Sequence, residues 1–254
     1  MMESEKQVVF ITGAGRGIGE AVARWFIEHD SDVVLNYRKA QGKGGANIER
    51  LVEYARSRGV RATPAIGDIS EPQDVEKMFR TLKEQGVSRL DHLVLNAAAA
   101  PFKPFSEMTR NDWKLLLGTN LIGNVACVNH ATEFMTRGGT ICAISSLGSL
   151  RPLPNYPLGV MKAALEQLIR YLEMELCPKG IRSNAVCAGF VNTDMLPVLR
   201  EKWPDIFEHL EKSGRPYIIE PREVAEVVGF LTSKAASAVR GEVLVADAGV
   251  SISI

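Results

Sequence analysis

A glycine-rich segment near the start of the chain restricts the possible fold most strongly. It follows an apolar run at residues 8–11 and precedes an amphipathic run at residues 21–27. An order of strand, glycine turn and helix is the setting in which such a segment binds a dinucleotide. The backbone can then approach the diphosphate at the positive end of a helix dipole. The expected cofactor-binding residues here are Gly13, Gly15, Arg16, Gly17, Ile18 and Gly19.

Strand-like and helix-like runs alternate along the rest of the chain. The expected strands are residues 8–12, 32–37, 61–66, 92–95, 140–145, 182–187 and 243–246. The expected helices are 17–29, 47–58, 71–85, 161–175 and 220–233, with one or two more within 111–135. The strands are almost wholly apolar, which is typical of strands buried on both faces. This order predicts an α/β fold: a single doubly wound Rossmann-type domain over residues 1–254, with a central parallel sheet of about seven strands and helices on both faces.

Composition narrows the class of protein. The 254 residues are 46% hydrophobic and 24% charged with a net charge of +0, which argues against nucleic acid as a partner. Residues 1–7 are polar without a signal-peptide pattern, and no apolar run is long enough to span a bilayer. The four cysteines are scattered and the four histidines lack metal-ligand spacing. We expect a cytoplasmic protein with no metal and no membrane contact.

Residues 190–217 interrupt the alternation. This long insertion between a strand and the next helix carries apolar residues among charges and prolines. Long excursions are often lids, and a loop after a strand's carboxyl end borders the ligand crevice of an open α/β sheet. We predict a lid here. Its residues Met195 and Leu196, with Phe102 and Phe105 after the fourth strand, are expected to form an apolar slot for an acyl chain.

Several short motifs resemble the short-chain dehydrogenase/reductase family across nearly the whole chain. They are the glycine segment, Asp68-Ile69, Asn96-Ala97-Ala98-Ala99, Asn120 and the run from Asn184 to Gly189 followed by Thr193. The resemblance implies that Asp68 and Ile69 cap the adenine ring and that Asn120 kinks a helix and serves a proton relay. It further implies cofactor contacts from Asn96, Ala97, Gly189, Val191 and Thr193.

The catalytic segment departs from the ordinary family pattern, which is Tyr-x-x-x-Lys. Lys162 matches the Lys, but Leu158 stands where the Tyr is expected. The stretch from Ser145 to Tyr156 resembles the enoyl-acyl-carrier-protein reductases, most closely the NADPH-dependent type III branch. Those enzymes place six residues between Tyr and Lys, whereas five lie between Tyr156 and Lys162. Because Pro157 and Gly159 disfavour an unbroken helix, we expect Tyr156 on the preceding loop, which can absorb the missing residue.

The resemblance implies a reductase that transfers hydride from NADPH to the C=C bond of a 2-enoyl thioester. The thioester would be carried on acyl-carrier protein or coenzyme A in fatty-acid or polyketide metabolism. Tyr156 would stabilise the enolate oxygen, Lys162 would bind the nicotinamide ribose, and Ser146, or failing it Ser145, would assist. Family members are usually homotetramers or homodimers. An ordinary carbonyl reductase of the same family, or a cofactor-binding member without turnover, are the alternatives.

The end of the second expected strand favours NADPH over NADH. NAD enzymes place an acid there to bind the ribose 2′-hydroxyl. This strand ends Asn36-Tyr37-Arg38-Lys39, without an acid. Arg38 and Lys39, with Arg16 of the glycine segment, are expected to neutralise a 2′-phosphate.

Overall fold

A seven-stranded parallel sheet forms the centre of the protein. The structure is a computed structural model and describes residues 6–253; most of the amino-terminal segment discussed above and both ends of the predicted domain lie outside this range. The sheet runs in the order β3-β2-β1-β4-β5-β6-β9, every neighbouring pair being parallel, and so confirms the predicted Rossmann-type fold. Its strands are β1 (Val8–Ile11), β2 (Asp32–Tyr37), β3 (Ala62–Ile66), β4 (Leu90–Leu95), β5 (Met135–Ser146), β6 (Arg182–Ala188) and β9 (Val243–Ala246).

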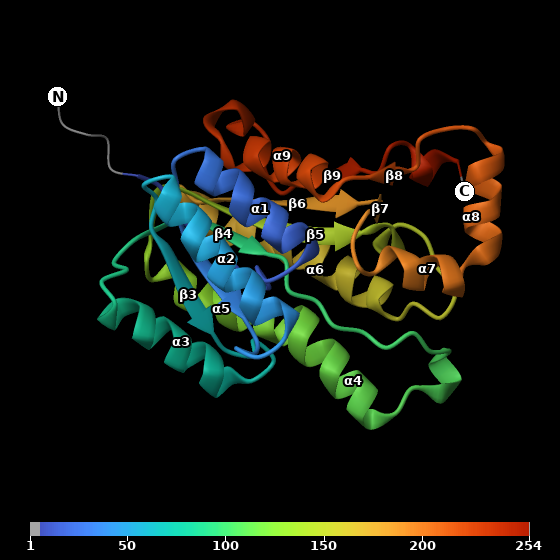
Figure 1. The fold of residues 1–254 in the computed structure, drawn as a ribbon, viewed down its shortest axis with the longest axis horizontal. Coiled ribbons are helices and arrows are strands. Elements are labelled where there is room, and N and C mark those ends of the chain that lie inside the picture. Colours follow the sequence, from blue (N-terminus) through green and yellow to red (C-terminus); the bar gives the residue numbers. More distant parts are fainter. Residues whose placement is uncertain (1–5, 254) are drawn as a thin grey trace.

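Helices cover both faces of this sheet (Figure 1). One face carries α1 (Gly17–Glu28), α2 (Lys43–Ser57) and α9 (Pro221–Thr232), and its core includes Val22 and Val228. The other face carries α3 (Pro72–Glu84), α5 (Gly123–Thr132) and α6 (Leu158–Leu176), and its core includes Phe79 and Leu165. Burial of these apolar stripes is the main favourable contribution to folding.

Element boundaries differ most from the expected ones in four places. Helix α2 begins at Lys43 rather than at residue 47. Gly45 in its first turn packs closely on Ala40, whose carbonyl oxygen would lie 1.7 Å from a Cβ at Gly45. Helix α6 begins at Leu158 rather than 161. Strand β5 begins at Met135 rather than at residue 140. Its pairing with β4 contains a register shift, and two glycines at 138–139 lie in the shifted stretch of β5. The region expected at 111–135 divides into α4 (Arg110–Leu117), a π-helical turn (Gly118–Ile122) and α5.

The insertion at 190–217 folds into defined elements. Its first strand, β7 (Phe190–Val191), pairs in parallel with β8 (Ile218–Ile219), and α7 (Leu196–Lys202) and α8 (Pro204–Lys212) lie between them. These helices lie beyond the carboxyl ends of the central strands (Figure 1). Their buried side chains form a separate apolar cluster with Leu147, Cys187 and Val250. We call residues 190–217 the lid segment.

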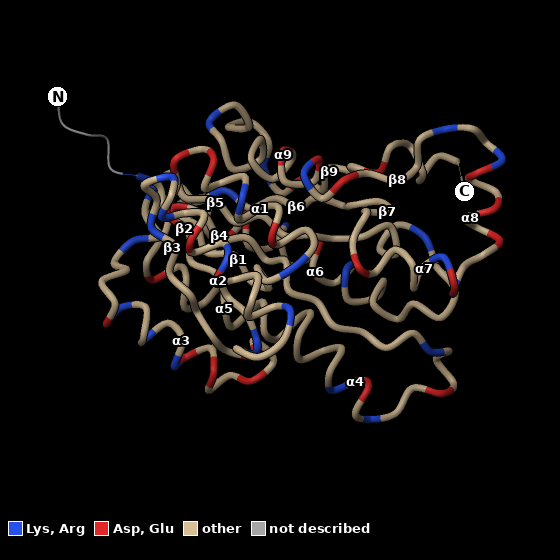
Figure 2. Tube along the Cα trace, in the orientation of Figure 1, with Lys and Arg blue, Asp and Glu red and all other residues tan. Residues whose placement is uncertain are grey.

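Charges of both signs are interspersed along the outer helices and loops, while the central strands are largely without them (Figure 2). This distribution agrees with the net charge of +0. Within residues 6–253, no helix is both long enough and apolar enough to cross a membrane.

Candidate active site and dinucleotide crevice

The glycine turn between β1 and α1 has the geometry of an anion cradle. Gly13 and Gly17 adopt positive φ angles of 66° and 54°, which L side chains rarely adopt. A Cβ at Gly19 would lie 2.3 Å from the Gly13 carbonyl oxygen, so only glycine fits there. Arg16, the residue just before α1, has an extended conformation, and no side chain among the described residues caps the start of the helix. The first-turn N–H groups therefore face the crevice, where they suit a diphosphate.

Polar side chains at the ends of β1, β2 and β4 fix this turn. Asn96 Nδ2 donates to the carbonyl oxygens of Thr12 and Gly13 at 2.9 and 3.1 Å. The Thr12 hydroxyl accepts the N–H groups of Asn96 and Ala97 at 2.9 and 3.0 Å. Buried Asn36 accepts the Gly13 N–H at 3.1 Å. The sequence alone did not reveal these roles of Thr12 and Asn36. The pattern that could have indicated them is a polar residue at the end of an otherwise apolar strand.

The side of the crevice expected to hold adenine gathers cations at the end of β2. Arg38, Lys39 and Arg16 are exposed, and Arg38 Nε lies 4.0 Å from Asp68 Oδ2. The other oxygen of Asp68 accepts the Ser70 hydroxyl at 2.7 Å, while Ile69 is buried. A further cation was not anticipated: Lys43, the first residue of α2, pairs with Asp194 of the lid segment at 2.6 Å. Lys43 thus connects the β2–α2 loop with the lid segment.

Asn120 anchors the loop after β4. It is fully buried in the π-helical turn, which interrupts the helix at this residue. Its Nδ2 donates to the carbonyl oxygens of Ala99 and Leu116 at 2.6 and 2.8 Å, and its Oδ1 accepts the Ala99 N–H at 3.3 Å. The asparagine therefore orders the 96–99 segment, which borders the crevice.

The carboxyl end of β5 brings together the candidate catalytic side chains. Tyr156 lies on the loop before α6, and its hydroxyl is 3.4 Å from Ser146 Oγ. Burial raises the pKa of this phenol, with the Ser146 hydrogen bond opposing the shift. Lys162 is buried on the first turns of α6 and donates to the Ile144 carbonyl oxygen at 2.6 Å. Burial lowers the pKa of Lys162 to about 8, against the opposing effect of the Glu166 carboxylate.

Ser145 is directed away from this group. Its hydroxyl, together with that of Ser149, donates to Glu166, one turn after Lys162 on α6. Glu166 is only 6% exposed, so a buried carboxylate lies beneath the catalytic end of β5. Between the two serines considered from the sequence, Ser146 is the one that faces Tyr156. The role of Glu166 was not anticipated, because helical spacing alone does not separate a buried carboxylate from a solvated one.

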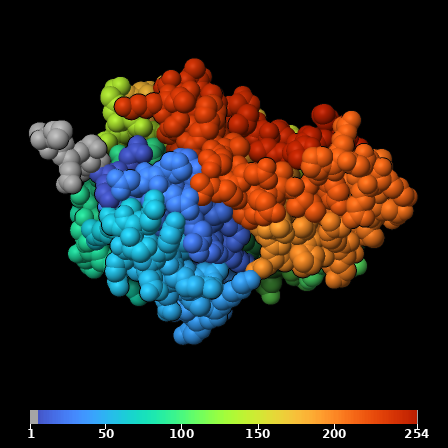
Figure 3. Space-filling view, turned by 45° about the horizontal axis from the view of Figure 1, so that its top comes forward, coloured from blue at the N-terminus to red at the C-terminus, as the bar shows by residue number. Residues whose placement is uncertain are grey.

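The segment after β6 closes the crevice from the side of the lid. The Gly189 N–H donates to the Ala246 carbonyl oxygen at 3.0 Å, and Val191 is buried in β7. Thr193 covers the glycine turn: its Cγ2 would lie 3.2 Å from a Cβ at Gly17. In the space-filling view the orange lid surface lies against the blue amino-terminal part of the chain (Figure 3).

Of the four residues expected to form an apolar slot, two are placed as expected and two are exposed. The Phe102 ring lies 5.5 Å from the ring of Tyr156 and 5.9 Å from that of Trp203. Leu196 is buried in the lid cluster, whereas Met195 is 46% exposed. Phe105 is 59% exposed and lies 6.0 Å from the Trp113 ring instead. Trp203, which was not singled out from the sequence, is the lid residue that touches Tyr156.

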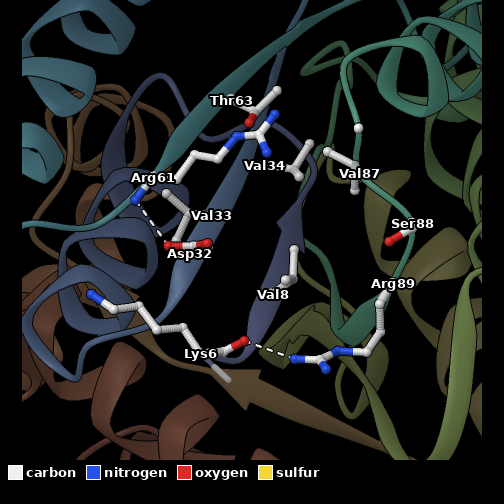
Figure 4. A pocket seen from close by; sticks show the side chains of 11 residues that line it. Lys6, Val8, Asp32, Val33, Val34, Arg61, Thr63, Val87, Ser88 and Arg89 are labelled. Carbon is white, nitrogen blue, oxygen red and sulfur yellow. Dashed lines mark hydrogen bonds between the residues drawn. The ribbon is translucent and has the colours of Figure 1, made fainter. Parts of the chain in front are cut away.

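A separate cavity of about 260 Å³ opens at the opposite, amino-terminal edge of the strands (Figure 4). Its charged groups are engaged with protein atoms: Asp32 accepts the Arg61 N–H, and Arg89 donates to the Lys6 carbonyl oxygen. Ligands of open α/β sheets bind at the carboxyl ends of the strands. The crevice at the glycine turn is therefore the candidate site, not this cavity.

Fold and site together define a class: a Rossmann-type domain with a dinucleotide cradle and a Ser-Tyr-Lys group at the carboxyl end of its sheet. A family model described as Enoyl-(Acyl carrier protein) reductase matches residues 13–251. The chain belongs to the short-chain dehydrogenase/reductase family, within this enoyl reductase-like group, and is an oxidoreductase.

Three relatives show the extent of the similarity. The chain is 34% identical over 253 residues to 1-cyclohexenylcarbonyl-CoA reductase of Streptomyces collinus, covering 97% of this chain and 88% of that protein. It resembles the structure of a blue fluorescent protein from a metagenomic library in complex with NADPH, with a TM-score of 0.87, 28% identity and coverage of 96% and 97%. A short-chain dehydrogenase of Burkholderia cenocepacia J2315 in complex with NADP gives a TM-score of 0.84, 27% identity and coverage of 96% and 97%.

Proposed function

We propose that the protein is an NADPH-dependent reductase of the C=C bond of a 2-enoyl thioester. The observation that carries this proposal is the pairing of Tyr156 with Ser146 from a loop that precedes α6. An enoyl reductase-like family model and the 34% identity to a reductase of an unsaturated acyl-CoA support it. The cations at the end of β2 and the NADP-bound relatives support NADPH as the cofactor.

NADPH, when bound, supplies the hydride that reduces the β-carbon of the thioester. Negative charge then develops on the thioester oxygen, where a donor aimed at it stabilises the transition state, and uptake of a proton at the α-carbon completes the saturated product. The Tyr156 hydroxyl is that donor, and its raised pKa keeps it protonated near neutral pH. Ser146 orients the phenol by its hydrogen bond.

Lys162 has a different task. One of its three N–H bonds is directed at the Ile144 carbonyl oxygen, which fixes the ammonium beside the end of β5. The other two would bind the ribose hydroxyls of the cofactor. The Glu166 carboxylate favours the charged form of Lys162. The charged lysine also stabilises negative charge that forms nearby.

The finer assignments belong to the same proposal. The carrier is coenzyme A or an acyl-carrier protein, the metabolic setting is fatty-acid or polyketide biosynthesis, and the compartment is the cytoplasm. The assembly is a homotetramer or homodimer formed through α4, α5 and α6. Exposed apolar side chains on the π-helical turn between α4 and α5 (Ile122) and on α6 (Val160, Tyr171 and Met174) support the assembly.

A parallel assay tests the function. Purified protein is mixed with NADPH and either a 2-enoyl-CoA, a cyclohexenylcarbonyl-CoA or a 3-ketoacyl-CoA, and nicotinamide absorbance is followed. Faster oxidation with an enoyl substrate, with the saturated acyl-CoA as product, supports the proposal. A preference for the ketone assigns carbonyl reduction, which Asn120 and Ser146 would also serve. Tight NADPH binding without turnover of any substrate supports the cofactor-binding member without activity.

A further inference from the structure

Tyr156 lacks the support that a helix gives to a catalytic side chain. In the Tyr-x-x-x-Lys arrangement both residues lie one turn apart on one helix. Here α6 begins at Leu158, and Asn155 beside the tyrosine has a positive φ of 55°. The orientation of the phenol must therefore be set by contacts outside α6.

Trp203 of the lid segment makes those contacts. Its indole N–H donates to the Pro154 carbonyl oxygen at 2.7 Å, two residues before Tyr156. Its ring lies 5.3 Å from the Tyr156 ring at an interplanar angle of 84°, the edge-to-face arrangement that aromatic pairs prefer. Trp203 is only 3% exposed, and the rings of Phe102 and Phe190 pack on it at 5.9 and 6.2 Å.

The turn after β5 also packs closely on the tyrosine ring. A Cβ at Gly148 would lie 2.7 Å from Tyr156 Cε1. The phenol thus contacts both the turn after β5 and the lid tryptophan, with Ser146 at its hydroxyl. Of these supports, only Trp203 comes from the lid segment.

We propose that Trp203 is a positioning residue that aligns Tyr156 for its reaction and makes this alignment depend on closure of the lid segment. The inference rests on the proposed role of Tyr156. Trp203 acts through the tyrosine loop: the indole hydrogen bond fixes the backbone at Pro154, and the ring edge fixes the plane of the phenol. A lid that opens would remove both contacts at once.

A double-mutant cycle of Trp203→Phe and Tyr156→Phe tests this role. Trp203→Phe keeps an aromatic ring but removes the N–H donor, and Trp203→Leu removes both contacts. Each should lower kcat for the enoyl thioester about tenfold or more, since misaligned reacting groups are costly. In the Tyr156→Phe background each should change the residual kcat by less than about twofold, because the hydroxyl that Trp203 positions is already absent. The dissociation constant of NADPH and the melting temperature establish that each variant is folded.

Trp25→Phe is the matched control. Its indole N–H donates to Glu226 at 2.7 Å between α1 and α9, so this variant loses a comparable bond away from the tyrosine. It should leave kcat unchanged. Equal losses of kcat from Trp203→Phe in both backgrounds would overturn the inference. An unchanged or raised kcat would also overturn it, because Trp203 would then only shield the tyrosine from solvent. Full activity of Tyr156→Phe alone would instead reject the proposed role of Tyr156, on which this inference rests.

Discussion

The hydroxyl of Tyr156 lies 3.4 Å from Ser146 Oγ, although the tyrosine precedes α6 and stands six positions before Lys162. The loop from Arg151 to Pro157 therefore delivers to the end of β5 a side chain that the ordinary family places on the helix. A Tyr–Lys spacing one residue shorter than that of the enoyl-acyl-carrier-protein reductases is compatible with an assembled Ser-Tyr pair because a loop, unlike a helix, has no fixed angular period.

Cofactor selectivity should depend on the cations at the end of β2. Arg38→Ala is expected to raise the KM for NADPH about tenfold by removing a charge-assisted bond to the 2′-phosphate. The KM for NADH, which lacks that phosphate, should change little. Steady-state kinetics with both cofactors measure the two values. Arg58→Ala, an exposed change at the far end of α2, is the control. Equal losses for both cofactors would contradict the assignment of Arg38.

The pH dependence of activity should reflect Lys162. Its pKa of about 8 in the folded protein means that the charged form predominates below that pH and is lost above it. The value of kcat/KM, which reports ionisations of the free enzyme, should therefore fall as pH rises through about 8. Glu166→Gln should move this fall to lower pH, because the carboxylate that favours the charged lysine is gone. If kcat/KM of Glu166→Gln falls at the same pH as that of the unchanged protein, Glu166 does not influence the ionisation of Lys162.

Stability at acid pH should depend on His92. This buried ring contacts the Thr140 hydroxyl at 2.8 Å, and burial lowers its pKa from 6.5 to about 4. A depressed pKa means that the unfolded chain binds the proton more readily, so the contribution is present above pH 6.5 and is lost as pH falls towards 4. The loss should reach about 2 to 3 kcal/mol near pH 4.5.

Urea unfolding at several pH values measures this contribution as the difference between the protein and His92→Gln. The variant cannot titrate at this position, so the difference should shrink as the solution is acidified. A difference in unfolding free energy that is constant with pH would show that His92 does not remain neutral in the fold.

Local patterns were sufficient to predict the sheet and the glycine turn. Runs such as Val33, Val34 and Leu35 report burial on both faces, and the spacing of Gly13, Gly17 and Gly19 reports a conformation confined to a few neighbouring residues. Both signals lie within one element and its turn, so they do not require knowledge of the tertiary fold.

Contacts between distant segments could not be predicted in this way. Trp203 and Pro154 are 49 positions apart, and their hydrogen bond depends on how the lid segment folds back. Glu166 has the spacing of an ordinary helical residue, and only the hydroxyls of Ser145 and Ser149 explain its burial. Such pairings arise from the tertiary arrangement and leave no periodic signature in the chain.

The most direct test of the account is the single-turnover rate of NADPH oxidation by a 2-enoyl-CoA, compared between the protein and Tyr156→Phe. If the loop tyrosine donates to the developing enolate, the rate should fall about 100- to 1,000-fold. The dissociation constant of NADPH should stay the same, because the proposed contact of Tyr156 is with the substrate and not with the cofactor. An undiminished rate in a variant that binds NADPH normally would show that another group stabilises the enolate and would contradict the assignment of Tyr156.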